Sequence, residues 1–335
     1  MALNLVYALK GNEIVFVDDV ETGKKCGCVC PACSSPLVAK NHGTKREHHF
    51  AHPPKLSCEY GYETSLHLAA KDILSKAKKM VIPPVIVEFP DSYKGNIVLS
   101  AEMEISIDRV ELEARFESIV PDVVVYAGKQ QLFIEIFVTH KIDDHKLAKL
   151  KKRGISTIEI DLSKAEQTIS PEELSDVLLK SSEEKTWRYN AKVEKWRNRF
   201  YSVADKRAIV VRGFATHVDD CPLAVRRWRG KSYANVMDDC IYCPYCISHD
   251  GDDEIVFCSG RLRISNIKDL KTFLLKQANM GNSVVSSQRN QVLGGVPNAE
   301  TLAAMEETDE MIRTDGGQHF TGTTADFFAM LDAGE

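Results

Sequence analysis

Apolar and polar residues alternate at the start of the chain. The stretch LNLVYALKGNEIVFVDDV keeps this alternation on both sides of a Gly-Asn pair, a pattern typical of two short strands joined by a turn. From residue 63 the period changes, because the apolar residues in ETSLHLAAKDILSKAKK recur at helical spacing. Pro83 and Pro84 follow this segment and end it. The pattern therefore predicts a β-hairpin followed by an amphipathic helix.

The central part of the chain mixes strand-like and helix-like patterns. Apolar runs between turn residues predict successive strands in VIVEFP, AEMEISIDRVELEARF, SIVPDVVVYAG and QQLFIEIFVTH. The segment DDHKLAKLKKRG predicts a helix that begins at an aspartate and ends at a glycine, and ISTIEIDL predicts one more strand. This order of a helix, several strands, a helix and a strand predicts an α/β or α+β core.

Composition divides the chain into five predicted segments. Residues 1–60 hold the hairpin and the first cysteines, and residues 61–165 hold the core. Residues 166–206 are rich in charge and predict a helical connector. Residues 207–280 predict a small cysteine-rich domain, and residues 281–335 have few apolar residues, which is typical of a flexible tail.

The charge distribution narrows the possible partners. A net charge of −5 over 335 residues excludes a uniformly basic nucleic-acid coat, but it leaves room for local basic clusters. One such cluster comprises Lys146, Lys149, Lys151, Lys152 and Arg153. The other surrounds Trp228 and comprises Arg226, Arg227, Arg229 and Lys231. Each cluster fits contacts to nucleic-acid phosphates and fits a solvated protein face equally well.

The number and grouping of the cysteines indicate metal sites. No apolar run is long enough to span a bilayer, and the N-terminus lacks the features of a secretory signal, which predicts a cytoplasmic protein with no membrane partner. Thiols stay reduced in that compartment, so the ten cysteines are not expected to form disulfides. They fall into two groups separated by a cysteine-free middle. We therefore predict two structural zinc sites.

The first predicted zinc site combines Cys30 and Cys33 with His49 and His52. Two close pairs of soft ligands suit tetrahedral Zn²⁺. A DNA-reading finger has three to five residues between its histidines, whereas the gap here is two and a double proline follows. The pattern predicts a structural clamp instead, with His48 as the alternative to His49. The other thiols of this group are expected to be small buried side chains: Cys26, Cys28 and Cys58.

The second predicted zinc site lies in the later cysteine group. Cys240 and Cys243 form a close pair, and Cys221 and Cys258 complete a four-thiolate site. Cys246, in CPYC, competes with Cys240 for the pairing with Cys243. The spacing predicts zinc but leaves the fourth ligand open.

Two carboxylates lie in neighbouring predicted strands. Asp122 follows a proline at the start of one strand, and Glu135 stands among apolar residues in the next. An antiparallel pair of strands would bring both carboxylates to one end of the sheet, where Mg²⁺ or Mn²⁺ could bridge them. A buried carboxylate without a partner is expensive, so Glu135 needs a reason to stand there. The alternative is that Glu135 points to solvent or pairs with a lysine.

A polar stripe precedes these strands. Glu63, His67 and Lys71 are four residues apart on the predicted helix, so they share one face. The stripe either points at the two carboxylates or forms ion pairs within the helix.

Three patterns occur in a fixed order: CPAC…HHFAH, then ETSLHLAAK, then IVPDVVV…FIEIFVTH. Over about residues 5–165 this order resembles the competence protein CoiA-like nuclease family, a branch of the PD-(D/E)xK nucleases with an N-terminal zinc element. The resemblance implies a restriction-endonuclease-like fold and Mg²⁺-dependent cleavage of DNA phosphodiester bonds. It also implies that Asp122 and Glu135 are the acidic residues of the motif and that Glu63 is the helical glutamate.

One position departs from the family pattern. The lysine expected two residues after the acid is Phe137. Lys146, in the first turn of the following predicted helix, is the best substitute. Lys141 shares the strand face of Glu135 but lies further along the chain.

The expected function is that of a metal-dependent nuclease acting on DNA in uptake, repair or anti-phage defence. One alternative is a DNA-binding module with the nuclease fold but without cleavage. Another is a scaffold whose zinc domains bind protein partners in a larger complex. The sequence also leaves a homo-oligomer open.

Overall fold

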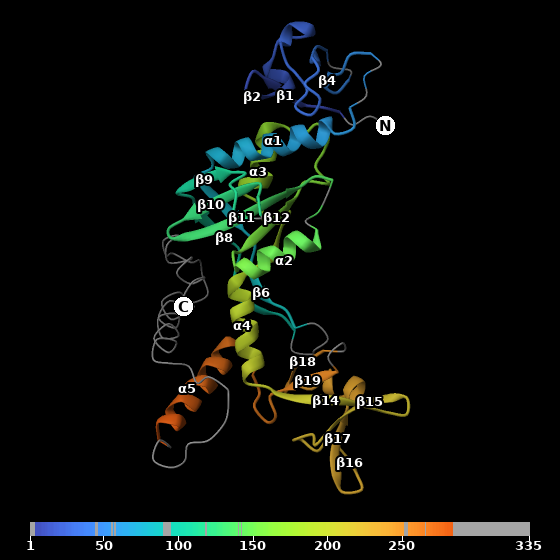
Figure 1. Cartoon of the computed structure of the whole chain (residues 1–335), viewed down its shortest axis with the longest axis vertical. Coiled ribbons are helices and arrows are strands. Elements are labelled where there is room, and N and C mark those ends of the chain that lie inside the picture. Colours follow the sequence, from blue (N-terminus) through green and yellow to red (C-terminus); the bar gives the residue numbers. More distant parts are fainter. Residues whose placement is uncertain are drawn as a thin grey trace. The chain divides into compact units, whose positions relative to one another are not determined.

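The computed structural model describes residues 4–43, 46–54, 56, 58–89, 95–117, 119–139, 141, 143–250, 254–264 and 266–283 (Figure 1). The chain forms two compact units. Among the described residues, unit 1 runs to Pro83 and resumes from Glu102 to Ala191, whereas unit 2 contains Pro84–Ala101 and the described chain from Lys192 to Ser283. In the part of the chain that is described, no helix has the length and apolar character needed to cross a membrane.

Unit 1 is built on a mixed sheet with the strand order β13-β12-β11-β10-β9. Strands β11 and β12 run parallel, and the other neighbouring pairs are antiparallel. The strands of this sheet are β9 (Arg109–Leu112), β10 (Val123–Ala127), β11 (Gln130–Phe137), β12 (Thr157–Asp161) and β13 (Lys185–Tyr189). A parallel pair needs a crossover connection, and a helix between β11 and β12 provides it.

Helices cover both faces of this sheet. They are α1 (Gly61–Lys76), α2 (Asp144–Arg153) and α3 (Pro171–Leu179). Figure 1 shows α1 and α3 on one side of the sheet and α2 on the other. Leu150 of α2 packs against Val124 and Phe133. Because both faces are covered, the central strands are apolar on both sides, and Val123–Val125 are fully buried.

The ends of α2 follow from its sequence. Asp143 caps the helix by accepting a hydrogen bond from the Lys146 backbone N–H at 2.7 Å. Gly154 ends the helix in the left-handed conformation, with φ +72°. The aspartate start and glycine stop expected from the sequence are thus both present.

The N-terminal part of unit 1 consists of two small antiparallel ribbons. They are formed by β1 (Tyr7–Lys10) with β2 (Glu13–Phe16), and by β3 (Val38–Lys40) with β4 (His49–Ala51). The first ribbon is the hairpin that the opening alternation predicts. A third ribbon of unit 1 pairs β5 (Lys79–Ile82) with β8 (Met103–Ser106).

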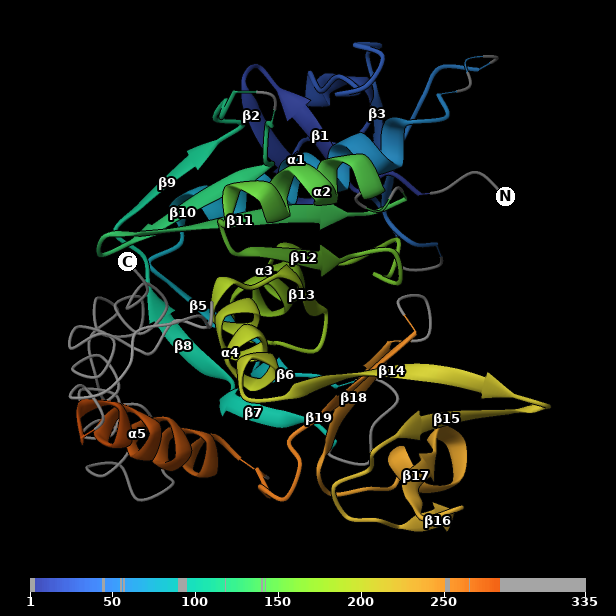
Figure 2. The ribbon, with the colours of Figure 1, turned by 60° about the horizontal axis from the view of Figure 1, so that its bottom comes forward.

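Unit 2 is built on an antiparallel sheet with the order β16-β17-β15-β14-β19-β18. Its strands are β14 (Asp205–Arg212), β15 (Ala215–Asp219), β16 (Arg226–Trp228), β17 (Lys231–Asn235), β18 (Cys246–Asp250) and β19 (Ile255–Cys258). Figure 2 shows β14 and β15 as a hairpin whose tip extends past β16 and β17. A π-helical turn, Val236–Cys240, follows β17.

A separate apolar core lies beside this sheet in unit 2. It joins Trp196 and Phe200 of α4 (Ala191–Ser202) to Leu270 and Leu274 of α5 (Ile267–Ser283). The ribbon of β6 (Val85–Val87) and β7 (Ile97–Ser100) contributes to the same core.

The structure is the mixed α/β architecture that the sequence predicts, but two segments differ from expectation. The stretch AEMEISIDRVELEARF was expected to be one strand and instead forms β8 and β9 in different sheets. The chain changes partners at Ile107 and Asp108, whose backbone N–H groups bond to Lys78 and Tyr126. The segment 166–206 was expected to be a helical connector, but it supplies α3 and β13 to unit 1 and most of α4 to unit 2. Most of the expected tail, residues 284–335, lies outside the described residues.

Candidate functional site

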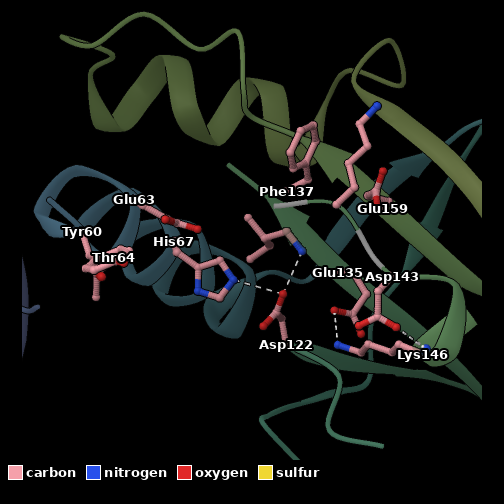
Figure 3. A pocket seen from close by; sticks show the side chains of 12 residues that line it. Tyr60, Glu63, Thr64, His67, Asp122, Glu135, Phe137, Asp143, Lys146 and Glu159 are labelled. Carbon is pink, nitrogen blue, oxygen red and sulfur yellow. Dashed lines mark hydrogen bonds and ion pairs between the residues drawn. The ribbon is translucent and has the colours of Figure 1, made fainter. Parts of the chain in front are cut away.

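Unit 1 contains a cleft of about 590 Å³ at the end of the β10–β11 pair (Figure 3). Its lining brings together residues from α1, β11, α2 and β12, and Asp122, which immediately precedes β10. All four residues expected to be catalytic line this cleft: Glu63, Asp122, Glu135 and Lys146. Strands β10 and β11 pair antiparallel with Val123 opposite Ile134, so Asp122 and Glu135 come from facing positions on neighbouring strands.

Asp122 is held by three donors. Its Oδ2 accepts a hydrogen bond from the Ile136 backbone N–H at 2.9 Å and lies 3.0 Å from His67 Nε2. Its Oδ1 lies 3.2 Å from Lys71 Nζ. Burial alone would raise the pKa of Asp122, but the contacts with His67, Ile136 N–H and Lys71 outweigh it and lower the pKa to about 2. Asp122 is therefore a stable carboxylate at neutral pH.

The polar stripe of α1 faces the carboxylates. Lys71 is buried, and its ammonium bridges Asp122 and Glu113 Oε1, the latter at 2.8 Å. His67 contacts the same aspartate, and Glu63 lines the cleft one turn earlier (Figure 3). The alternative of ion pairs confined to the helix is therefore wrong for His67 and Lys71.

Glu135 is the least satisfied group in the cleft. Its side chain is only 7% exposed, and its Oε2 accepts a hydrogen bond from Lys146 Nζ at 2.6 Å. The other oxygen, Oε1, is buried and has no hydrogen-bond partner among the described residues. Burial raises the pKa of Glu135 to about 7; Lys146 works against this rise, and the nearby charge of Asp122 adds to it. A buried oxygen without a donor costs free energy unless a ligand binds it.

Lys146 reaches Glu135 from the helix that follows β11. It stands in the first turn of α2, close to the capping residue Asp143, and its side chain is 28% exposed. Phe137 stands where the lysine was expected, and the Lys141 ammonium lies 5.2 Å from its ring centre. Lys141 lines the cleft, whereas Lys146 makes the contact with Glu135.

Several cleft residues did not emerge from sequence reasoning. They are Tyr60, Thr64, Asp143 and Glu159, with Glu113 beyond them on Lys71. Glu159 lies directly beside Glu135 in the parallel register of β11 and β12 and is buried. A glutamate in the apolar stretch ISTIEIDL was a usable signal for it. Glu113 follows β9, and no local pattern connects it to Lys71.

The donors in this cleft suit a hard divalent cation. Asp122 and Glu135 offer carboxylate oxygens, which Mg²⁺ and Mn²⁺ prefer, and the lone Glu135 Oε1 lacks any other partner among the described groups. The residues therefore fit the ion that the sequence led us to expect.

A Cys/His cluster in the N-terminal part of unit 1 can bind zinc. Ligand atoms of Cys30, Cys33, His52 and Cys58 all lie within 4.8 Å of one another. Cys30 Sγ is 3.8 Å from Cys58 Sγ, and Cys33 Sγ is 3.5 Å from His52 Nε2. A set of one imidazole and three thiolates is typical of closed structural zinc sites.

The prediction of His49 as the fourth ligand is wrong, and so is the alternative, His48. His49 Nδ1 lies 3.0 Å from the Glu47 carbonyl, and His48 contacts Asp18 and Gly43 instead. Cys58, expected to be a spare thiol, takes the place. Cys26 and Cys28 are buried outside the cluster, as expected.

Gly61, the first residue of α1, lies against this cluster. A Cβ atom at this position would meet Cys58 Sγ at 3.4 Å and Cys30 Sγ at 3.5 Å, which is ordinary van der Waals contact. The cluster and the helix that carries Glu63 and His67 are therefore directly linked.

The later cysteines line a small cavity in unit 2. Its lining includes Cys221, Cys240, Cys243, Cys246 and Cys258. Burial first, and then interaction with the thiols of Cys221, Cys243 and Cys258, raises the pKa of Cys240 to about 12. Among the described residues, only the N-terminal cluster has its ligand atoms within 4.8 Å of one another, so these thiols are spaced more widely.

The two basic clusters differ in the partners of their charged side chains. In the first, Lys146 faces the cleft and Arg153 pairs with Glu117 at 2.9 Å. In the second, Arg226 is engaged by Asp239 at 2.7 Å and by Asp238 at 3.3 Å. Trp228 is half exposed, and the Arg229 guanidinium lies 5.1 Å from its ring centre.

No protein-family model, curated protein or solved structure matches this chain. Its function therefore has to be inferred from the cleft itself.

Proposed function

We propose that the protein is a metal-dependent nuclease with a restriction-endonuclease-like core that hydrolyses DNA phosphodiester bonds in the unit 1 cleft. One observation carries the proposal. Glu135 is buried with one oxygen on the Lys146 ammonium and the other without a partner among the described residues, next to the ionised Asp122. Two carboxylates and one ammonium at the end of a strand pair are what phosphodiester hydrolysis with a hard cation requires.

Asp122 and Glu135 would hold the Mg²⁺ or Mn²⁺ ion. When bound, such an ion polarises the phosphate and lowers the pKa of a water molecule so that it can attack. Glu135 Oε1 is the natural first contact, because it has no other donor among the described groups. Asp122 reaches the same place from β10 and is already ionised, so it needs to lose no proton.

Lys146 supplies positive charge where negative charge develops. Phosphodiester cleavage builds charge on the phosphate oxygens, and a positioned ammonium stabilises the transition state more than the ground state. The Lys146 side chain is partly exposed in the cleft, so its ammonium can meet a phosphate without leaving Glu135. This role compensates for Phe137.

His67 and Lys71 act on Asp122 from α1. They hold its carboxylate in place and keep it ionised, which preserves its geometry before the cation binds. Glu63 stands on the same face of α1 and lines the cleft, where it can orient a water molecule or assist in holding the cation.

The order of elements supports the proposed core. Helix α1 is followed by strands β5 to β11, then by α2 and β12, and Asp122 and Glu135 hold facing positions of the β10–β11 pair. This is the order of a helix, several strands, a helix and a strand that the residue pattern predicts. The Cys/His cluster next to Gly61 fits a structural zinc that fixes the start of α1.

A nucleic-acid-binding module without cleavage is the second candidate. It is favoured by the contacts of Asp122, whose two oxygens are already taken by His67, Lys71 and a backbone N–H. These contacts already balance the negative charge of the Asp122 carboxylate, so its affinity for a cation is lower. The absence of a lysine at Phe137 points in the same direction.

One experiment separates the two candidates. Linear, circular and single-stranded DNA are incubated with the purified protein in Mg²⁺, in Mn²⁺ and in EDTA. Nuclease activity predicts cleavage in at least one metal, and its loss in Asp122→Asn and Glu135→Gln with DNA binding and zinc content unchanged. Binding without cleavage in any metal would support the second candidate, and neither binding nor cleavage would contradict both. We propose that such cleavage serves DNA uptake, repair or anti-phage defence.

A further inference from the structure

The second unit carries a cysteine group that the proposed nuclease chemistry does not use. The thiols come from separate segments: Cys221 follows β15, Cys240 ends the π-helical turn, and Cys258 ends β19. Cys243 lies in the turn between Cys240 and β18, and Cys246 is the first residue of β18. All of them line one cavity of about 30 Å³. Convergence of thiols from distant segments on one small cavity needs a physical reason.

The apolar core at this place is small. The buried residues of the cluster are Val218, Val236, Cys246 and Val256, with Cys240, Cys243 and Cys258 packed against them. Several large apolar side chains on the nearby strands and turns are exposed instead, among them Phe214 and Tyr242. A structure with so few buried side chains usually depends on a cross-link. A metal ion held by thiolates is the cross-link that fits these cysteines, all of which are free.

The backbone around the thiols is arranged for ligands. The Cys243 N–H donates to the Cys240 carbonyl, and the Cys246 N–H donates to the Cys243 carbonyl, each at 3.0 Å. These consecutive turns present Cys240 and Cys243 from one knuckle. The Gly260 N–H donates to Cys258 Sγ at 3.4 Å, in a conformation with φ +69° that favours glycine. Such N–H donors stabilise thiolates bound to metal.

The charge of a four-thiolate site also has a counterpart here. Arg207 lines the same cavity, and its Nη atoms bond to the Asp220 carbonyl at 3.1 Å and to Asp205 at 3.2 Å. A guanidinium held beside the thiols offsets part of the negative charge that four thiolates would bring.

We propose that Cys221, Cys240, Cys243 and Cys258 form a second structural zinc site and that Cys246 is a packing residue. Cys240, Cys243 and Cys258 pack against the same buried valines, and Cys221 lines the same cavity. Cys246 is 2% exposed and belongs to the buried valine cluster. Binding exchanges thiol protons for Zn²⁺ and involves no oxidation. Since Cys221 and Cys243 lie in turns, they can draw in to the Zn–S distance of about 2.3 Å. The proposal does not rest on nuclease activity.

The test compares zinc content in single variants of the full chain. Wild type is expected to hold about two zinc ions per chain, and Cys243→Ser or Cys221→Ser about one, because one closed site loses a ligand. Cys246→Ala is the matched control from the same cavity and should keep both ions. Cys33→Ser should lose only the N-terminal ion, and its combination with Cys243→Ser should leave none.

A spectroscopic measurement avoids the risk that a variant does not fold. Cadmium-substituted wild type should give two ¹¹³Cd resonances, with the four-sulfur site further downfield than the site containing one nitrogen. A single resonance, or full zinc content in Cys243→Ser, would overturn the proposal. It would also fail if Cys246→Ala lost one ion while Cys221→Ser kept both. A disulfide between Cys246 and Cys258, which face each other in the β18–β19 register, would appear as missing thiols after unfolding without reductant and would equally refute it.

Discussion

Lys146 Nζ lies 2.6 Å from Glu135 Oε2, although one residue stands on a helix and the other on a strand. The contact is possible because α2 begins soon after β11 ends and the Asp143 cap fixes its first turn. The ammonium thus reaches the carboxylate from the helix, while the strand position holds Phe137.

Replacement of Lys146 should therefore remove transition-state stabilisation. We expect Lys146→Ala to lower the rate of DNA cleavage by about a hundredfold or more, the size typical of losing one such contact. Single-turnover kinetics on a fixed DNA substrate at saturating Mg²⁺ measure this rate apart from binding.

Two lysines serve as controls for that variant. Lys152→Ala removes the same charge from an exposed position on the same helix and should leave the chemical step nearly unchanged. Lys141→Ala removes the ammonium near Phe137 and should affect binding more than the rate. If Lys141→Ala were inactive and Lys146→Ala normal, Lys141 would be the catalytic lysine.

The raised pKa of Glu135 predicts a pH effect on stability. Its pKa of about 7 in the folded protein exceeds the ordinary value of 4.5, so between these values the folded state binds more protons than the unfolded state. In buffer without Mg²⁺, the free energy of unfolding should fall as pH rises through this window, by on the order of 3 kcal/mol at most. Urea unfolding at pH 5 and pH 8 measures the change, and Glu135→Gln should show a smaller one.

The raised pKa of Glu135 also predicts how metal binding depends on pH. Below about pH 7, Glu135 holds a proton that a cation must displace, so Mg²⁺ affinity should rise as pH increases through that value. Calorimetric titration in two buffers of different ionisation enthalpy reports the released proton. An affinity that stayed flat from pH 6 to pH 8 would argue against Glu135 as a ligand.

The cleft could be predicted in large part because its geometry is local. Asp122 and Glu135 flank one tight turn at Gly128, and an antiparallel pair with a short turn fixes the register of its strands. Lys146 follows from the same reasoning, because α2 starts a few residues beyond β11. The pattern predicted strands less well where tertiary packing decides their pairing. It gave one strand where the chain forms β8 and β9, which separate at Ile107.

Contacts between distant segments could not be read in the same way. Cys58 joins the cluster because the chain turns back after the double proline, where the Leu56 N–H bonds to the Pro53 carbonyl. Regular spacing favoured His49 over Cys58, yet spacing says nothing about where a loop returns. Glu113 reaches Lys71 for the same kind of reason, since their contact spans 42 residues.

The corrected ligand set of the N-terminal cluster gives a sharp test. Cys58→Ser should release the zinc ion and unfold the N-terminal ribbons, because binding energy in such a site is folding energy. His49→Ala should keep the ion, since His49 lies outside the cluster. Zinc analysis and circular dichroism of both variants decide between them. Retention in Cys58→Ser together with loss in His49→Ala would restore the spacing-based assignment.

The β16–β17 hairpin should bind single-stranded nucleic acid through its exposed tip. Trp228 is 52% exposed and pairs with Arg229, which suits stacking of a base on the indole. Arg227 is also exposed, whereas Arg226 is taken up by Asp238 and Asp239. Trp228→Ala should weaken single-stranded DNA binding by about 1–3 kcal/mol, or roughly five- to 150-fold. Arg227→Ala should instead lower the salt dependence of log Kd by about 0.7 for one lost phosphate contact.

Arg212→Ala is the matched control, because it removes the same charge from the neighbouring hairpin, where Asp219 engages the guanidinium at 2.7 Å. Fluorescence anisotropy between 50 and 200 mM salt (roughly the range in which such contacts are resolved) measures all three variants. Equal losses in Arg212→Ala and Arg227→Ala would mean that binding follows overall charge, and the hairpin tip would have no particular part in it.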